Sequence, residues 1–124
     1  MMYEKGFHQY RENSLNTMTS GELLMLLYDE LVKRLTIAEI ELNSKNYEPF
    51  EAAVQRSDEI IRYLDETLDH KYAISKNLAQ LYEYFNYQLI RVRIGRNVKV
   101  LQEVKSMVTE LREAFREADK KSSQ

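Results

Sequence analysis

Residues 23–42 read LLMLLYDELVKRLTIAEIEL, and this stretch sets the architecture of the chain. Its apolar residues recur at intervals of three and four, the period of one face of an α-helix. The residues on that face are Leu23, Leu24, Leu27, Leu31, Leu35, Ala38 and Leu42. The preceding Thr19-Ser20-Gly21-Glu22 has the S/T-x-x-E pattern of a capping box. Together these features predict an amphipathic helix over residues 19–42.

The same stretch carries more apolar side chains than one helix face needs. With residues placed about 100° apart, the surplus lies as follows: Met25 and Val32 on one flank, Leu26, Ile37 and Ile40 on the other, and Tyr28 at the edge of the face. Each such side chain left in water forgoes about 1.5–3 kcal/mol, and exposed apolar patches often mark binding sites. Three coverings remain open: the chain's own helices and N-terminal segment, a partner helix in a groove, or a second copy of the chain.

Three further helices are predicted after polar breaks. Pro49 suits the first turn of the second helix, where its missing N–H costs nothing. Ser75 is expected to cap the third helix, Gly95 to follow its C-terminal end, and Asn97 to cap the fourth. The inward stripe of the fourth helix is Leu101, Val104, Val108, Leu111, Phe115 and Ala118.

Four long amphipathic helices with short connections imply an all-α fold, an antiparallel up-down-up-down four-helix bundle. We expect residues 1–18 to form a flexible N-terminal arm that is ordered only where it docks. The bundle is expected to span residues 19–120, and residues 121–124 to form a frayed tail.

The composition bounds the function classes. The chain has 124 residues, a formal net charge of −2 and no cysteine. One domain is expected, without disulfides or thiolate zinc sites, and without the strong positive field that favours nucleic acid or anionic membranes. The first residues lack the apolar segment of a signal peptide, and no apolar run is long enough to insert into a membrane. We therefore expect a cytoplasmic protein.

No pattern indicates catalysis, a cofactor or a metal. Neither His8 nor His70 has a glutamate three residues before it, as the Glu-x-x-His motif of di-iron bundles requires. Gly-rich phosphate loops and nucleophile–base signatures are also absent from the sequence. Asp29 is interpreted as a solvated or hydrogen-bonded structural residue. A ligand-binding or enzymatic bundle remains as a rival hypothesis.

Two surface features stand outside this pattern. Arg91, Arg93, Arg96 and Lys99 cluster at the break between the third and fourth helices. This cluster is interpreted as a solvated helix end or as a contact for acidic groups of a partner, and a nucleic-acid role lacks a supporting motif. Tyr84 and Tyr87 fall off the inward stripe of the third helix and are expected at a rim, where tyrosine is common in interfaces.

An ordered set of short motifs resembles the flagellar export chaperone FliS family. The set covers residues 3–118 and consists of Tyr10, Leu15-Asn16-Thr17, Leu23-Leu24, Leu27-Tyr28-Asp29, Ile60-Ile61, Leu64, Leu68-Asp69, Leu81-Tyr82, Leu101-Gln102-Glu103-Val104 and Leu111-Arg112-Glu113-Ala114-Phe115. The chain departs from the family pattern at four places: Ser20 replaces a turn proline, Glu30 a glycine, Val92-Arg93 an Ala-Asn pair, and Phe115 a tryptophan.

The resemblance implies a helical bundle without enzymatic activity that binds the C-terminal segment of flagellin in the cytoplasm. In such proteins that segment is disordered when free and becomes partly helical as it wraps around the chaperone. Premature filament assembly is thereby blocked, and the subunit is held for flagellar type III export. The flagellar export gate is a further candidate partner, and no cofactor or nucleic acid is implied.

The predicted client groove and arm consist of Tyr10, Leu15, Met25, Leu26, Tyr28, Val32, Ile37 and Ile40. The role of Tyr10 rests on the resemblance, and the helix residues on the surplus apolar surface. We expect a monomer or weak dimer. The alternative is a structural bundle that homodimerises through the surplus face of the first helix.

Overall fold

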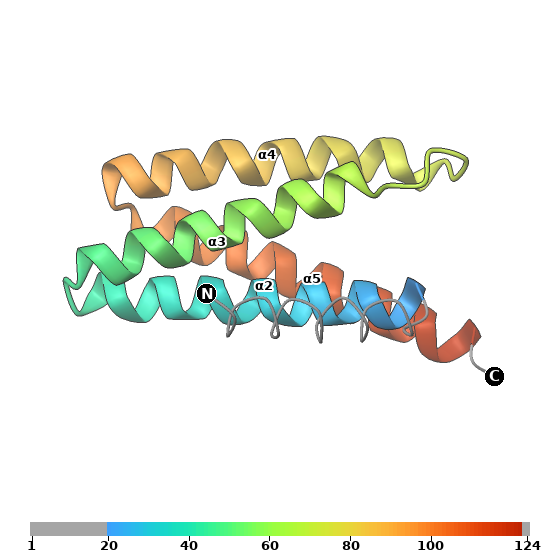
Figure 1. The fold of residues 1–124 in the computed structure, drawn as a ribbon, viewed down its shortest axis with the longest axis horizontal. Helices are drawn as coiled ribbons and strands as arrows, with labels where there is room; N and C mark the ends of the chain where they lie inside the picture. The colour runs from blue at the N-terminus through green and yellow to red at the C-terminus, as the bar shows by residue number, and fades with distance from the viewer. Residues whose placement is uncertain (1–19, 123–124) are drawn as a thin grey trace, which may run out of the picture.

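The computed structural model describes residues 20–122, which form four helices joined by short connections. Helix α2 spans Ser20–Asn43, α3 Tyr47–Glu66, α4 Ile74–Gly95 and α5 Val98–Ser122. Consecutive helices run in opposite directions (Figure 1). The predicted four-helix bundle is confirmed, and α5 continues past the predicted boundary at residue 120. The predictions for the arm, Tyr10, Leu15 and the capping Thr19 lie outside the described residues.

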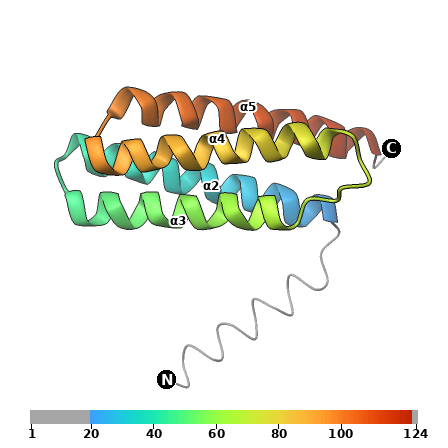
Figure 2. The same cartoon turned by 90° about the horizontal axis from the view of Figure 1, so that it is seen from above.

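Each helix packs against two neighbours, so the four helices occupy the corners of a square. Contacts join α2 to α3 and α5, and α4 to α3 and α5. In Figure 1 α4 and α2 lie on opposite sides of the bundle with α3 and α5 between them, and in the perpendicular view of Figure 2 α5 and α3 form the two edges with α4 and α2 between them. The outward faces of α2 and α4 therefore point in opposite directions.

The core follows the predicted stripes closely. In α2 the fully buried residues are Tyr28, Leu31, Leu35 and Ala38, with Leu42 nearly so. Their three-four spacing keeps one seam facing inward along the bundle. In α5 the predicted stripe is buried from Leu101 to Val108, partly buried at Leu111 and Phe115, and exposed at Ala118.

Helix ends correct two predictions. Helix α4 begins at Ile74, one residue before the expected cap, so Ser75 lies inside the first turn and is buried. Its backbone N–H donates to the Tyr72 carbonyl at 3.1 Å, so the turn is closed by backbone rather than by a side-chain cap. At the other end, Gly95 is the last helical residue and Arg96 adopts the left-handed conformation, with φ of 52°.

The αL residue at this end is unusual because arginine carries a Cβ, which makes that conformation unfavourable. The Arg96 guanidinium lies over the Tyr47 ring, with its carbon 3.5 Å from the ring centroid. Its backbone N–H donates to the Val92 carbonyl at 2.8 Å. The stacked Arg96 side chain thus stabilises the residue that ends α4. The sequence had predicted Gly95 at that position, one residue earlier. Asn97 caps α5 as predicted, since its Oδ1 accepts from the Val100 N–H at 3.2 Å.

Candidate functional site

The surplus apolar residues of α2 are covered to different degrees. Leu26 and Ile40 are 42% and 55% exposed. Met25, Val32 and Ile37 are half-buried, and the latter two pack against the core. Leu26 and Ile40 lie 14 residues apart, roughly 21 Å along the helix. The outer face of α2 therefore presents two separated apolar side chains with partly covered ones between them, rather than a continuous exposed stripe.

One flank of α2 borders α5. Asp29 lies on this flank and pairs with Arg116 at 3.2 Å, and Glu39 accepts hydrogen bonds from Gln102 and Lys105 of α5. At about 100° per residue Met25 and Val32 fall between Asp29 and Glu39 around the helix. Their apolar atoms are therefore shielded in part by polar contacts between the two helices.

Tyr28, predicted as a partner contact, is instead part of the core. It is fully buried, its hydroxyl lies 2.5 Å from that of Tyr82 on α4, and its ring centroid lies 5.4 Å from that of Phe115 on α5. The helical wheel placed Tyr28 at the edge of the core face, but neighbouring helices close over that edge. The hydroxyl pair explains how two tyrosines can be buried, because one hydroxyl donates to the other and neither oxygen is left without a partner.

Burial governs the ionisation of both phenols. Loss of water raises the pKa of Tyr28, and the neighbouring Tyr82 raises it further. Loss of water also raises the pKa of Tyr82, against a smaller lowering by the hydrogen bond with Tyr28. Both groups are neutral at neutral pH and link α2 to α4 as structural residues.

Asp29 is an ion-pairing surface residue, as predicted. Its carboxylate is half-exposed, 3.2 Å from Arg116 and 3.7 Å from Arg112, both on α5. The Leu-Tyr-Asp motif of α2 therefore contacts α4 through its tyrosine and α5 through its tyrosine and aspartate. The resemblance motifs at Tyr28 and Tyr82 meet inside the bundle, which gives them a packing role.

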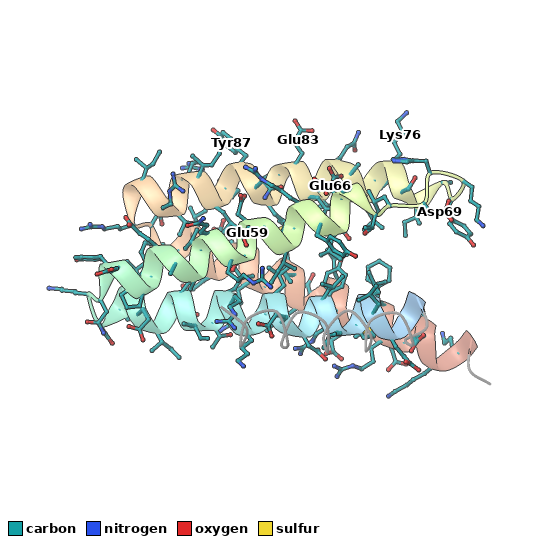
Figure 3. All side chains as sticks on the ribbon, in the orientation of Figure 1. Glu59, Glu66, Asp69, Lys76, Glu83 and Tyr87 are labelled. Carbon is teal, nitrogen blue, oxygen red and sulfur yellow. The ribbon has the colours of Figure 1, made fainter. Side chains whose placement is uncertain are left out.

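Among the described residues, the largest group of exposed apolar side chains lies on α4, not on α2. Tyr84, Tyr87, Ile90 and Ile94 are 40%, 60%, 50% and 76% exposed. Tyr87 projects away from the other helices, on the same side as Glu83 and Lys76 (Figure 3). Tyr84 and Tyr87 lie at a rim, as their positions in the sequence predicted, whereas the exposure of Ile90 and Ile94 was not predicted. The sequence feature that indicates them is the three-four spacing of Tyr87, Ile90 and Ile94, which forms a second helical stripe opposite the core stripe.

An open groove between α2 and α5 is lined by Glu39, Gln102, Lys105, Ser106, Thr109 and Glu110. There the hydrogen bond from Gln102, with a further contribution from Lys105, lowers the pKa of the Glu39 carboxyl. Within residues 20–122 no three His, Cys, Asp or Glu side chains are grouped so as to hold a metal ion. None of the helices in this range carries an apolar stretch of membrane-spanning length.

The chain is similar in sequence and in fold to known flagellar proteins. The sequence model of the family described as flagellar protein FliS matches residues 3–122. The flagellar secretion chaperone FliS of Bacillus subtilis (strain 168) is 28% identical over 118 residues, covering 95% of this chain and 89% of that protein. A crystal structure of a flagellar chaperone from bacteria superimposes with a TM-score of 0.78 at 17% identity, covering 95% of this chain and 98% of the other. At that identity the structural likeness concerns the fold alone.

Proposed function

We propose, from the premise that this chain belongs to the FliS family of flagellar proteins, that it is a flagellar export chaperone whose client is the C-terminal segment of flagellin. The match over residues 3–122 is the observation that carries this proposal. The role is binding without catalysis, in the cytoplasm, before the client is exported. Holding the segment bound prevents premature polymerisation of the flagellin subunit.

The outer face of α2 supplies the proposed client contacts. Leu26 and Ile40 are exposed there, and Ile37 lies between them, half-buried. An amphipathic client helix that lays its apolar side along α2 would cover these residues. A disordered client loses conformational entropy on binding, so the contact must bury much apolar surface to offset that loss. Tyr28 has no place in this contact because it is already buried.

Titration calorimetry with a flagellin C-terminal peptide tests the proposal. We expect one-to-one binding, a gain of peptide helicity by circular dichroism, and a negative heat-capacity change between two temperatures. Leu26→Asp and Ile40→Asp should each weaken binding roughly tenfold or more, since each removes a buried apolar contact. Added salt should change the affinity little, because the contacts are apolar.

Ile74→Asp is the matched control. Ile74 is 56% exposed, like Ile40, but begins α4 on the opposite side of the bundle. This variant should bind the peptide as the parent chain does. Absence of heat and of helicity gain at tens of micromolar peptide would contradict the client assignment. A stable dimer by light scattering that Ile40→Asp dissociates would support the alternative, homodimerisation through the first helix.

The N-terminal segment is the second part of the proposed client-handling machinery. Tyr10 and Leu15 fall in it and lie outside the described residues. Deletion of residues 2–16 should leave the helical circular dichroism and the thermal transition nearly unchanged, while client binding or release changes. Collapse of the thermal transition would assign the segment to the folded domain instead.

A further inference from the structure

The outward side of α4 combines an apolar stripe with unpaired positive charge. We propose that this surface, formed by Tyr87, Ile90 and Ile94 with the basic cluster Arg91, Arg93, Arg96 and Lys99, docks an acidic amphipathic helix of a second protein. The proposal goes beyond client binding, since it concerns a different face and a different partner. We name this surface the α4 outer face.

The apolar part has the spacing of a helix-docking stripe. Tyr87, Ile90 and Ile94 are separated by three and four residues and share one side of α4, pointing away from the core. They are 60%, 50% and 76% exposed. The stripe spans roughly 10 Å along the helix axis, or about two turns of a partner helix. A partner helix with apolar residues at matching intervals would bury all three side chains.

The charge on this face selects the sign of the partner. Four basic residues and no acidic residue lie between Glu83 and Glu103 in the sequence. None of the four makes an ion pair with the described residues 20–122, whereas Arg34, Arg62 and Lys105 each pair with a carboxylate. On the helical wheel Arg91 and Arg93 fall on opposite sides of the apolar stripe. A helix with apolar residues on one side and acidic residues at its margins complements this arrangement.

Two of the basic side chains are held in place. Arg91 donates to Gln88 Oε1 at 2.9 Å, and Gln88 donates to the Tyr84 hydroxyl, also at 2.9 Å. Arg96 is stacked on Tyr47 at 3.5 Å. A side chain that is already ordered loses less conformational entropy when a partner carboxylate pairs with it. Arg91 is therefore preorganised beside the stripe, and Arg96 is held at the end of α4 that follows it.

A second copy of the chain fits this face less well. Glu83 is the one acidic residue of α4, and it lies with Tyr87 on the outward side of that helix (Figure 3). In an antiparallel pair it would neutralise one of the four cations, and α4 offers no acidic residue for the other three. A parallel pair would oppose the two basic clusters directly, which is unfavourable.

The position of the face leaves it accessible beside a client on α2. Helices α2 and α4 occupy opposite corners of the bundle and are separated by α3 and α5. One straight client helix therefore cannot cover both outer faces. A client held only along α2 leaves the α4 outer face free for its partner, whereas a client that wraps around the bundle as far as α4 would compete for it.

The test uses a synthetic probe rather than an unknown partner. The probe is an amphipathic peptide with leucine at alternating three- and four-residue intervals and glutamate at the margins of the leucine face. Matched controls are the same peptide with lysine replacing glutamate, and a scrambled peptide of identical composition. Fluorescence anisotropy gives the affinity for the full chain, and amide chemical shifts locate the contact. We expect saturable binding of the glutamate peptide alone, with the largest shifts in residues 84–99.

Variants of the chain separate the apolar and charged parts. Ile94→Ser should weaken probe binding roughly tenfold, and Arg93→Gln should weaken it less and reduce its salt dependence. Ile74→Ser, at the far end of α4 and 56% exposed, is the control and should bind normally. All three positions are exposed, so the fold should be preserved, as circular dichroism checks.

Four results would overturn the proposal. These are equal binding of the lysine or scrambled peptide, displacement of the probe by the flagellin peptide, a dimer that Ile94→Ser dissociates, and tighter binding of a single-stranded oligonucleotide at the same residues. Displacement by flagellin would assign the α4 outer face to the client and leave the chaperone proposal standing. Failure of the flagellin peptide to bind, with the probe still bound, would contradict the proposed client and leave the proposal for the α4 outer face standing.

Discussion

The buried hydroxyl pair of Tyr28 and Tyr82 predicts a specific pattern of non-additive stability. The two oxygens lie 2.5 Å apart, and both side chains are at most 1% exposed. Tyr28→Phe removes one hydroxyl and leaves the other buried without a partner. Tyr82→Phe does the same from the other side. The double variant removes both hydroxyls and leaves two rings of nearly unchanged shape.

The magnitudes follow from the cost of an unsatisfied buried polar group. Each single variant should lower the free energy of unfolding by about 1–3 kcal/mol, because the orphaned hydroxyl cannot reach water. The double variant should lose about 1 kcal/mol or less, since no orphan remains. The double variant should therefore lose less than the sum of the two single losses, by at least about 1 kcal/mol, as expected for residues in direct contact.

Urea unfolding followed by circular dichroism measures the effect. The single variants should remain folded, because small domains have about 5–15 kcal/mol of stability. Their thermal midpoints should fall by roughly 4 °C for each kcal/mol lost. Tyr87→Phe is the matched control, because Tyr87 is 60% exposed and its stability change should stay within about 0.5 kcal/mol.

Either of two results would contradict the assigned hydroxyl pair. If the double variant lost the sum of the two single losses, each hydroxyl would be stabilising the fold through some other partner. Two neutral single variants would be equally contrary, since they would mean that water reaches both oxygens. The control variant distinguishes either result from a general effect of removing phenol groups.

Three further predictions concern pH, the α2 faces and a helix cap. The pKa values of Tyr28 and Tyr82 are raised in the folded chain, so their neutral forms stabilise it fully below about pH 10, and stability is lost above that pH at up to about 1.4 kcal/mol per pH unit for each. The double phenylalanine variant should therefore show a shallower alkaline loss of stability in urea titrations. Leu27→Asp should unfold or severely destabilise the chain because Leu27 packs against the core, whereas Leu26→Asp should leave the thermal midpoint nearly unchanged because Leu26 is 42% exposed; equal losses would contradict this assignment. Asn97→Ala should cost about 1 kcal/mol by removing the α5 cap, and an unchanged urea midpoint would show that water replaces the side chain.

Helix positions and the core stripes could be read from the sequence alone. The three-four spacing from Leu31 to Leu42 and from Leu101 to Val108 depends only on local periodicity, and a helix with such a stripe must bury it. Few glycines and prolines and short polar breaks then leave an antiparallel bundle as the natural packing. Asn97 was predictable for the same reason, since a cap acts on its own helix.

Which apolar side chains are buried in the bundle and which are exposed on its surface depended on tertiary structure. A helical wheel gives the direction of Tyr28 but not whether a neighbouring helix closes over it, and the hydroxyl of Tyr82 lies 54 residues away in sequence. Likewise Ile90 and Ile94 are exposed only because nothing in the described bundle packs on the outward side of α4. Periodicity is a property of one helix, whereas burial is a property of the distances between helices. The sequence therefore determined which sides of each helix are apolar, and the packing of the four helices decided which of those sides remain available to a partner.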